Sequence, residues 1–417
     1  MPVKLDEHLD AFRQRTPATV EGGLPRQDAR ELAKLFHPDA RLARRRAGVA
    51  TAQRDYAGTW VDPQLQTNVQ RILATVPARW VHSVQLGFTL PINGRLGKQR
   101  ELADRKLDAS LVKAWAVEQQ VANDLDAAWA QWSAAQRRAA LFAATCDNLG
   151  NLEQIASALV EAGSLTKPGA RVFTLERRQK DAARNMAIAN ERAARLEVLR
   201  RIGLHPEAEL ELQPDLEVQP FVADAALRRT AVQTSPRLVT QQLAHATAEA
   251  NLDLQVRKQW PDLQLAPGWQ HEDGDLRAQI GFNLPLPIFT GNDPAIYKAF
   301  AQRDLTAAAL RAELEQLTQE LAIAEVRHAA AVELAQRFAE LLTVARQQVE
   351  DGQQLAAAGQ LDTMLMLDAL LRVHNVQMQA IDADVAAALA TIKINTLLTD
   401  PNSQPTVAPT TPAGDNR

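Results

Sequence analysis

Apolar side chains recur along the stretch 294–358 at the spacing of a helix that packs against neighbouring helices. Their positions alternate three and four residues apart, from Leu310 through Leu317 to Val349, and His328 occupies one place in the series. A seven-residue repeat of this kind predicts helices that supercoil left-handed around one another. At about 1.5 Å per residue, a helix over this stretch would be about 100 Å long.

Shorter segments alternate apolar and polar residues with a period of two, which predicts half-buried strands. The segments 80–91 and 276–286 have apolar even positions and mostly polar odd positions, and the segment 261–270 alternates in the same way. The segment 60–67 is the weakest strand because Pro63 interrupts it. Strands of about ten residues fit a membrane barrel, and taken alone they fit a soluble hairpin equally well.

These elements occur twice in the same order, at an offset of roughly 195 to 200 residues, so the chain contains an internal repeat. Each repeat contains a helix, two strands, a long helix, a turn and a second long helix; the first repeat spans 24–203 and the second spans 235–399. The long helices are expected at 95–163, 168–202, 294–358 and 362–398. The remaining segments are an N-terminal extension (1–23), a connector with a short helix (204–234) and a disordered tail (400–417).

Composition narrows the class of protein. The chain is 46% hydrophobic and 23% charged, and its net charge of −4 comes from interleaved acidic and basic residues, so nothing indicates nucleic-acid binding. The one cysteine, Cys146, cannot form an internal disulfide, and we expect it to be buried in a helix. The sequence contains no catalytic constellation, phosphate-binding loop or cluster of metal ligands. We therefore expect no enzymatic activity, no cofactor and no metal site.

No apolar run approaches the ~20 residues that a membrane-spanning helix needs. Residues 1–23 lack the apolar centre of a signal peptide, so an exported protein would have lost its signal from this numbering or be truncated at its start. Four strands cannot close a barrel, and lipid does not tolerate an open sheet edge. If the strands sit in a membrane, three chains could share one barrel of about twelve strands.

The resulting fold class is mainly α with a small β part. Long coiled-coil helices form an α-barrel, and four strands per chain contribute to a shared, 12-stranded transmembrane β-barrel of a trimer. The order of elements, the paired Ala-Gly turns and the stretch from Gly281 to Phe289 resemble the outer-membrane efflux family typified by TolC, over roughly residues 24 to 399. Three short segments resemble its cobalt–zinc–cadmium (CzcC-type) branch: Asp62 to Leu65, Gly94 to Gln99 and Arg201 to Leu204.

The resemblance implies a homotrimer in the bacterial outer membrane whose helices extend into the periplasm. Its partners would be outer-membrane lipid, a periplasmic adaptor protein and an inner-membrane pump of the RND type. The implied function is a passive exit duct of a tripartite efflux system, with heavy-metal cations as the favoured cargo. Two alternatives stay open: a duct of the same family for drugs or polypeptides, and a coiled-coil scaffold without a transport function.

By the same resemblance, the two turns between long helices are tips that dock the adaptor. The tip residues are Ala162, Gly163, Ser164 and Leu165 in the first turn and Ala358, Gly359, Gln360 and Leu361 in the second. The structural alternative is a plain helix hairpin, with glycine in a left-handed cap. Pro168 and Gly169, which follow the first turn, depart from the family's pattern.

Asp362 and Asp368 are candidate residues of a pore gate. Three copies would place a ring of carboxylates near the narrow end of the duct, and such a ring favours cations. The alternatives are an N-cap for Asp362 and a solvated helix face for Asp368. Leu361 and Leu365 stand where the family's type member has polar residues linked to its gate, so its gating network is not carried over.

Three further groups have a structural and a functional interpretation. The aromatic residues Trp60, Trp80, Trp260 and Trp269 flank the strands as an interfacial girdle or as ordinary core residues. The soft-metal ligands Met364, Met366, His374 and Met378 fit core packing better than a copper site, because Met364 and Met366 do not share a helix face. The polar residues His271, Glu272, Asp273 and Asp275 are expected at a solvated hairpin tip, with capture of a divalent ion as the alternative.

Overall fold

The computed structural model describes residues 23–73, 79–220, 232–272, 275–287, 290–357 and 362–398, together with the single positions 14, 224 and 228. The expected tail, 400–417, and nearly all of the expected N-terminal extension, 1–23, lie outside these residues. The described part is mainly helical and contains one four-stranded sheet, as the fold class predicted.

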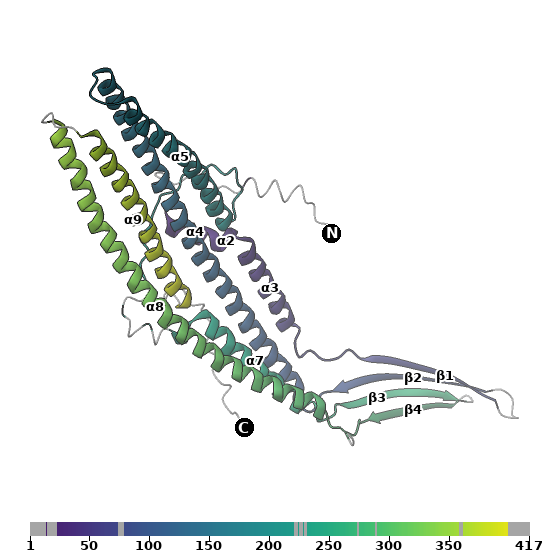
Figure 1. Ribbon diagram of the computed structural model, residues 1–417. Coiled ribbons are helices and arrows are strands. Elements are labelled where there is room, and N and C mark those ends of the chain that lie inside the picture. The colour runs from purple at the N-terminus through teal and green to yellow at the C-terminus, as the bar shows by residue number, and fades with distance from the viewer. Residues whose placement is uncertain are drawn as a thin grey trace. The chain divides into compact units, whose positions relative to one another are not determined.

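The elements follow one another in the duplicated order (Figure 1). The first repeat contains α2 (Arg26–Phe36), α3 (Pro38–Asp55), β1 (Gln64–Ile72), β2 (Arg79–Leu90), α4 (Arg95–Glu161) and α5 (Lys167–Ile202). After the connector with its short helix η1 (Val232–Thr234), the second contains α7 (Pro236–Arg257), β3 (Leu263–Glu272), β4 (Asp275–Asn283), α8 (Asp293–Ala357) and α9 (Thr363–Leu397).

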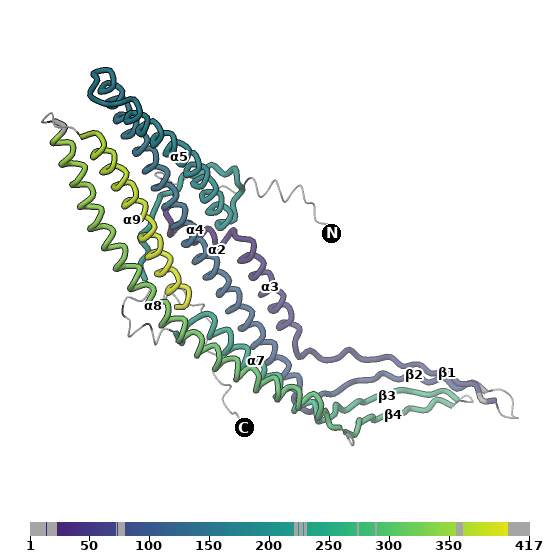
Figure 2. The backbone as a smooth tube through the Cα atoms, in the orientation of Figure 1, coloured from purple at the N-terminus to yellow at the C-terminus, as the bar shows by residue number. Residues whose placement is uncertain are grey.

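The chain divides into two compact units that do not coincide with the two repeats. Of the described residues, the first unit takes in those up to Ala43, Trp115–Ser235 and those from Gln316 to residue 398. The second takes in Arg44–Ala114 and Pro236–Glu315. Each unit therefore combines segments of both repeats, as the purple and green parts of the trace show for the sheet in Figure 2.

Four long helical segments of the first unit lie side by side in the order α8, α9, α4 and α5 (Figure 1). On one side, α4 packs through Leu125 and Trp129 against α5, with α2 completing the cluster. On the other side, Ala130 and Ala134 of α4 pack against Ile392 of α9. Because alanine has a small side chain, these two helices approach closely along the α4–α9 contact.

In the second unit, α7 packs against the beginnings of α4 and α8. Leu102 of α4 lies in a small core with Ala250 and Leu254 of α7. On the α8 side, Arg237 Nε lies 2.7 Å from Glu313 Oε1. These contacts fix the helical base from which the strands extend.

The sheet is antiparallel throughout, in the order β1-β2-β3-β4. Its central pair, β2 and β3, joins the two repeats, with His82 opposite His271 and Leu90 opposite Leu263. The register of β2 with β3 is interrupted at Leu86 and Gly87, opposite Pro267 and Ala266, and Pro267 lacks the N–H that a ladder needs.

Prolines explain two of the differences between the strands and the predicted bounds. The first strand begins at Gln64 rather than at residue 60, directly after Pro63. Its predicted end at residue 67 is wrong, because the strand pairs with β2 as far as Ile72. The last strand ends at Asn283 rather than at residue 286, before Pro285. The other two strands are each within two residues of the predictions 80–91 and 261–270, at Arg79–Leu90 and Leu263–Glu272.

Candidate functional site

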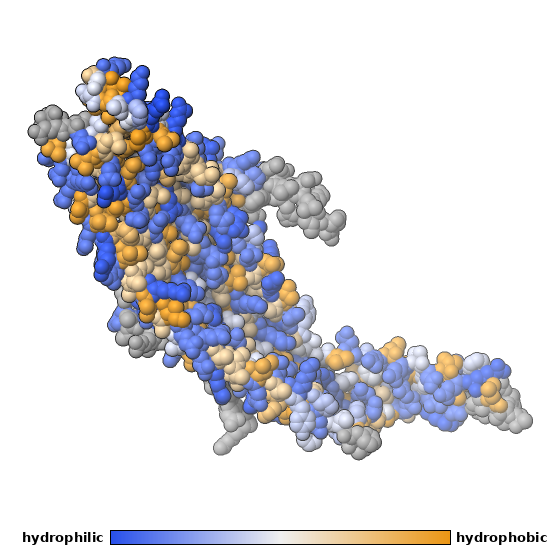
Figure 3. All heavy atoms as spheres, viewed as in Figure 1, coloured by the Kyte–Doolittle hydropathy of each residue, from blue (hydrophilic) through white to orange (hydrophobic). Residues whose placement is uncertain are grey.

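One face of the sheet is apolar and uncovered. The register brings the apolar positions of all four strands to the same side, so that Leu65 faces Leu86 and Leu265 faces Phe282. Phe282 and Leu276 each expose 72% of their surface, and Ile280 exposes 66%. Hydrophobic side chains accordingly reach the surface along the strands (Figure 3). A folded domain in water buries such a face against another layer of secondary structure. This face is therefore suited to contact with an apolar partner or environment.

The four tryptophans in and beside the strands are surface residues and not core residues. Trp60, Trp80, Trp260 and Trp269 each expose more than half of their surface. Trp80 and Trp269 lie toward the hairpin ends of β2 and β3, and Trp60 and Trp260 precede β1 and β3 at the helical end. The interpretation of these residues as ordinary core tryptophans is therefore wrong.

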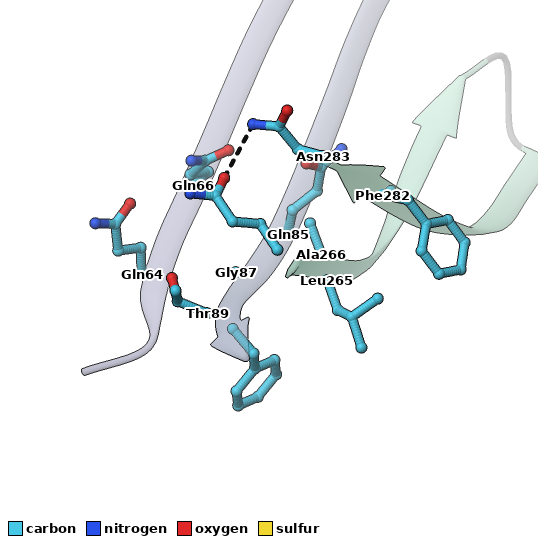
Figure 4. Close-up of a pocket in the computed structure, with 12 residues that line it drawn as sticks. Gln64, Gln66, Gln85, Gly87, Thr89, Leu265, Ala266, Phe282 and Asn283 are labelled. Carbon is cyan, nitrogen blue, oxygen red and sulfur yellow. Dashed lines mark hydrogen bonds between the residues drawn. The ribbon is translucent and has the colours of Figure 1, made fainter. Parts of the chain in front are cut away.

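The opposite face of the sheet is lined by neutral amides. Gln64, Gln66 and Gln85 line a hollow together with the small residues Gly87 and Gly281. Asn283 Nδ2 donates to Gln264 Oε1 at 3.0 Å, so the amides also bond across the neighbouring strands β3 and β4. Figure 4 shows Leu265 and Phe282 on the other side of the strands from Gln64 and Gln66. The sheet therefore has one polar face and one apolar face.

A polar junction fastens the strands to the helices. Asn93 Nδ2 donates to the carbonyl of Trp260 at 2.6 Å, while its Oδ1 accepts from the backbone N–H of Arg95 at the start of α4 at 3.0 Å. The guanidinium of Arg95 forms a two-pronged ion pair with Asp262, at 3.0 and 2.6 Å. Because these groups come from both repeats, the junction ties the two halves together at the base of the sheet.

The first predicted tip is a helix hairpin closed by Gly163. Its φ of 75° is left-handed, and Ser164 N and Leu165 N both donate to the carbonyl of Leu159, which is the glycine cap expected at a helix end. Ala162, Gly163 and Ser164 are exposed, whereas Leu165 packs against the core of the hairpin. The structure also explains the unexpected Gly169, because a Cβ there would lie 3.1 Å from the Leu165 side chain.

The second predicted tip, Ala358, Gly359, Gln360 and Leu361, lies outside the described residues. Beyond it, Asp362 caps α9 by accepting hydrogen bonds from the backbone N–H groups of Met364 and Leu365, at 3.0 and 3.1 Å. Asp368 is exposed and pairs with Arg372 one turn later, at 2.9 Å. Asp362 thus caps a helix and Asp368 lies on an exposed helix face, as the structural alternatives predicted.

Near this tip, the candidate soft-metal ligands are divided between core and surface. Met366 is buried in the cluster that joins α4, α5 and α9, whereas Met364 is exposed. His374 is buried, and its Nδ1 lies 2.9 Å from Thr145 Oγ1. Since the Thr145 hydroxyl donates to the carbonyl of Leu141, it accepts from His374 Nδ1–H. Burial, and secondarily Lys180, lowers the pKa of His374 to about 4, so this histidine is a neutral core residue.

Sequence reasoning missed a buried ionic cluster in the first unit. Asp126 of α4, only 2% exposed, pairs with Arg30 of α2, and Arg26 Nη1 lies 3.8 Å from Asp126 Oδ1. Arg26 continues to the connector, where its Nε donates to Asp215 at 3.1 Å and its Nη2 donates to the carbonyl of Glu217 at 2.7 Å. The available signal was a pair of acids, Asp124 and Asp126, within a largely apolar stretch of α4, together with two arginines one turn apart on α2.

Two further observations concern the described residues as a whole. None of their helices combines the length and the apolar character needed to cross a membrane. They contain no group of three or more metal-ligating side chains. Cys146 is buried as expected, and burial raises the pKa of its thiol to about 11.

We compared the sequence and the structure with those of known proteins. No family model matches the chain. The cobalt-zinc-cadmium resistance protein CzcC of Cupriavidus metallidurans is 22% identical over 265 residues, which is 63% of this chain and 63% of the length of that protein.

Solved structures match over more of the chain. CusC, in a study of transmembrane channel formation, has a TM-score of 0.73 at 16% identity, over 93% of this chain and 95% of that one. The outer membrane protein VceC of Vibrio cholerae has a TM-score of 0.73 at 15% identity, over 89% of this chain and 95% of that one. The MtrE outer membrane channel of Neisseria gonorrhoeae has a TM-score of 0.72 at 16% identity, over 89% and 88%. The chain therefore has the fold of the TolC-type outer-membrane channels, as the duplicated order of its elements predicted.

Proposed function

We propose that the chain is one third of a trimeric exit duct in the bacterial outer membrane, and that the duct is a passive part of a tripartite efflux system. The observation that carries this proposal is the free-standing sheet. Its apolar face is uncovered, and among the described residues β1 pairs only with β2 and β4 only with β3. Both outer edges therefore present unpaired backbone groups, which lipid does not tolerate.

Sister chains can remove both edges at once. If β4 of one chain pairs with β1 of the next, three chains close a barrel of about twelve strands, within the range of membrane barrels. Along β2, the ten residue steps from Trp80 to Leu90 cover about 34 Å at ~3.4 Å per step. A tilt of about 40° reduces this to roughly 26 Å, which is close to the ~25 Å apolar band of an outer-membrane barrel.

The helices of the first unit also have two edges that suit sister chains. Along α5, a second heptad series is exposed at every position: Val172, Leu175, Gln179, Ala182, Met186, Ala189, Ala193 and Leu196. At the other edge, α8 exposes Ile323, Leu334, Leu341, Val344 and Leu355. An apolar seam at heptad spacing is completed by a partner helix, and we infer that α5 of one chain packs against α8 of the next.

Charge supports this pairing of α5 with α8. The 36 residues of α5 include ten basic and four acidic side chains. The part of α8 in the first unit, residues 316–357, includes six acidic and three basic ones. Opposite net charges favour association of the two edges and oppose the pairing of α5 with another α5.

The proposed cargo and partners are inferred from the similarity to known proteins. The relative CzcC is a cobalt-zinc-cadmium resistance protein, so divalent heavy-metal cations are the favoured cargo. A passive duct needs an energy source elsewhere. We assign this role to an inner-membrane pump of the RND type, which acts through a periplasmic adaptor.

Fractionation of cells that carry the full gene tests the duct directly. We expect a trimer in the outer-membrane fraction whose mobility on a detergent gel changes on heating, and a deletion strain that is sensitive to cobalt, zinc or cadmium. A soluble monomer would overturn the duct and favour a coiled-coil scaffold. A trimer whose deletion sensitises cells only to drugs would keep the duct and replace the cargo.

For adaptor docking, Ser164 offers an exposed position at the first tip that is free of the backbone strain at Gly163. We expect Ser164→Trp to abolish export while the trimer remains intact. The matched control is Ser157→Trp, which changes an exposed serine two turns earlier on α4. Export unaffected by Ser164→Trp would count against docking at this tip.

For the pore gate, the contribution of charge can be separated from helix capping. Serine caps helices as aspartate does, so Asp362→Ser keeps the cap of α9 and removes the carboxylate. We expect Asp362→Ser and Asp368→Asn to reduce cation selectivity in planar bilayers. Selectivity equal to that of the unmodified channel in both variants would remove these residues from the gate.

A further inference from the structure

We propose that His82 and His271 together bind one divalent transition-metal ion on the apolar face of the sheet. The two residues are directly paired across β2 and β3. Side chains of directly opposed residues in antiparallel strands project from the same face, with Cβ atoms about 4.5–5.5 Å apart. Both histidines are exposed in the single chain. They lie at the hairpin end of β2 and β3, beside Trp80 and at the margin of the apolar face, where an ion from solution can reach both imidazoles.

The neighbouring side chains restrict one of the two imidazoles. The Trp80 ring stacks on His82 with a centroid separation of 6.4 Å and an interplanar angle of 17°. Arg71 lies over the same indole, with its guanidinium carbon 5.7 Å from the ring centroid. This stack limits the orientations of His82, so less rotational freedom is lost when it binds an ion.

The residues on either side of the histidine pair determine which ions fit the site. The histidines are flanked by Val69 on β1 and Leu276 on β4. Imidazole ligands without carboxylates select Cu²⁺, Ni²⁺ and Zn²⁺ over Mg²⁺ and Ca²⁺. Two protein ligands leave coordination positions for water or for another donor.

This site differs from the acidic hairpin tip that the sequence suggested. Glu272 follows His271 in the strand and so projects from the opposite face, where its Oε2 lies 3.1 Å from Nη1 of Arg277. Glu272 is therefore no partner for His271. The histidine pair comes from a single chain, so its binding of metal does not depend on the trimer or on the proposed cargo.

Copper provides a direct probe. The full-length chain, purified in detergent, is titrated with Cu²⁺, and its electron paramagnetic resonance spectrum is recorded. We expect one ion per chain with hyperfine coupling to two nitrogens, displaced by Zn²⁺ but not by Mg²⁺. His82→Asn and His271→Asn should each weaken binding at least tenfold. His245→Asn is the matched control, because His245 lies on α7 and bonds to Thr306.

A second measurement tests the geometry without metal. Cysteines introduced as His82→Cys together with His271→Cys should form an intrachain disulfide on oxidation, while the buried Cys146 stays reduced. Failure of this disulfide would overturn the proposal by showing that the pair is not in register. Disulfide formation without copper binding by the unmodified chain, or undiminished binding by His82→Asn, would overturn it as well.

Discussion

Placing a charge on the apolar face of the sheet tests the barrel most directly. Ile280 lies in the middle row of that face, opposite Pro267, and is 66% exposed in the single chain. Its neighbour Gln279 projects from the amide-lined face. Because adjacent strand residues point in opposite directions, Ile280→Arg and Gln279→Arg add the same charge at the same depth on opposite sides of one wall.

The expected free-energy cost of the charge follows from its depth in the membrane. An arginine that faces lipid at the midplane of a membrane barrel costs about 2–4 kcal/mol, whereas substitutions on the lumen side do not carry this cost. For each chain, this corresponds to a shift of roughly 30- to 900-fold in the folding equilibrium. A trimer has three such positions in one band, so its total cost is about 6–12 kcal/mol.

The assay measures the amount of heat-modifiable trimer in the outer-membrane fraction and the urea concentration that unfolds the barrel in lipid vesicles. We expect Ile280→Arg to remove most of the trimer and to lower the unfolding midpoint, and Gln279→Arg to behave like the unmodified chain. Equal behaviour of the two variants, or the reverse order, would refute the assignment of the apolar face to lipid.

Three further predictions concern stability. Asp126→Asn should lower the free energy of unfolding by about 3–5 kcal/mol, because it removes the buried carboxylate that pairs with Arg30. Glu333→Gln changes an exposed ion pair and should cost under about 1 kcal/mol; urea titration of both variants compares the two losses. Gly268→Ala should destabilise the sheet by about 1–3 kcal/mol, since its Cβ would lie 2.3 Å from the Val84 carbonyl oxygen; the same titration should show a smaller loss for Gly281→Ala. Burial lowers the pKa of His374 to about 4, whereas the unfolded chain has a value of ~6.5. The stability that the neutral histidine contributes is therefore complete above pH ~6.5 and is lost as the pH falls toward 4, by up to about 1.4 kcal/mol per pH unit. His374→Phe should flatten the dependence of unfolding free energy on pH in this range.

The sequence determined the elements and their order. Heptad spacing along α8 and period-two alternation in β2 are properties of neighbouring residues, so they can be read before the chain folds. The same holds for the glycine cap at Gly163 and for the capping role of Asp362, which depend on bonds within one turn. Strand ends were less certain because prolines such as Pro63 act at single positions.

Only the tertiary structure decided which distant residues meet. Alternation predicted an apolar side for each strand, but the register of β2 with β3 placed all four apolar sides on one face and brought His82 opposite His271. The burial of Asp126 against Arg30, 96 residues away, and the division of the chain into units that mix the two repeats were also invisible in the sequence. Such contacts join segments that have no common local pattern, and their free energy arises only when burial removes both partners from water.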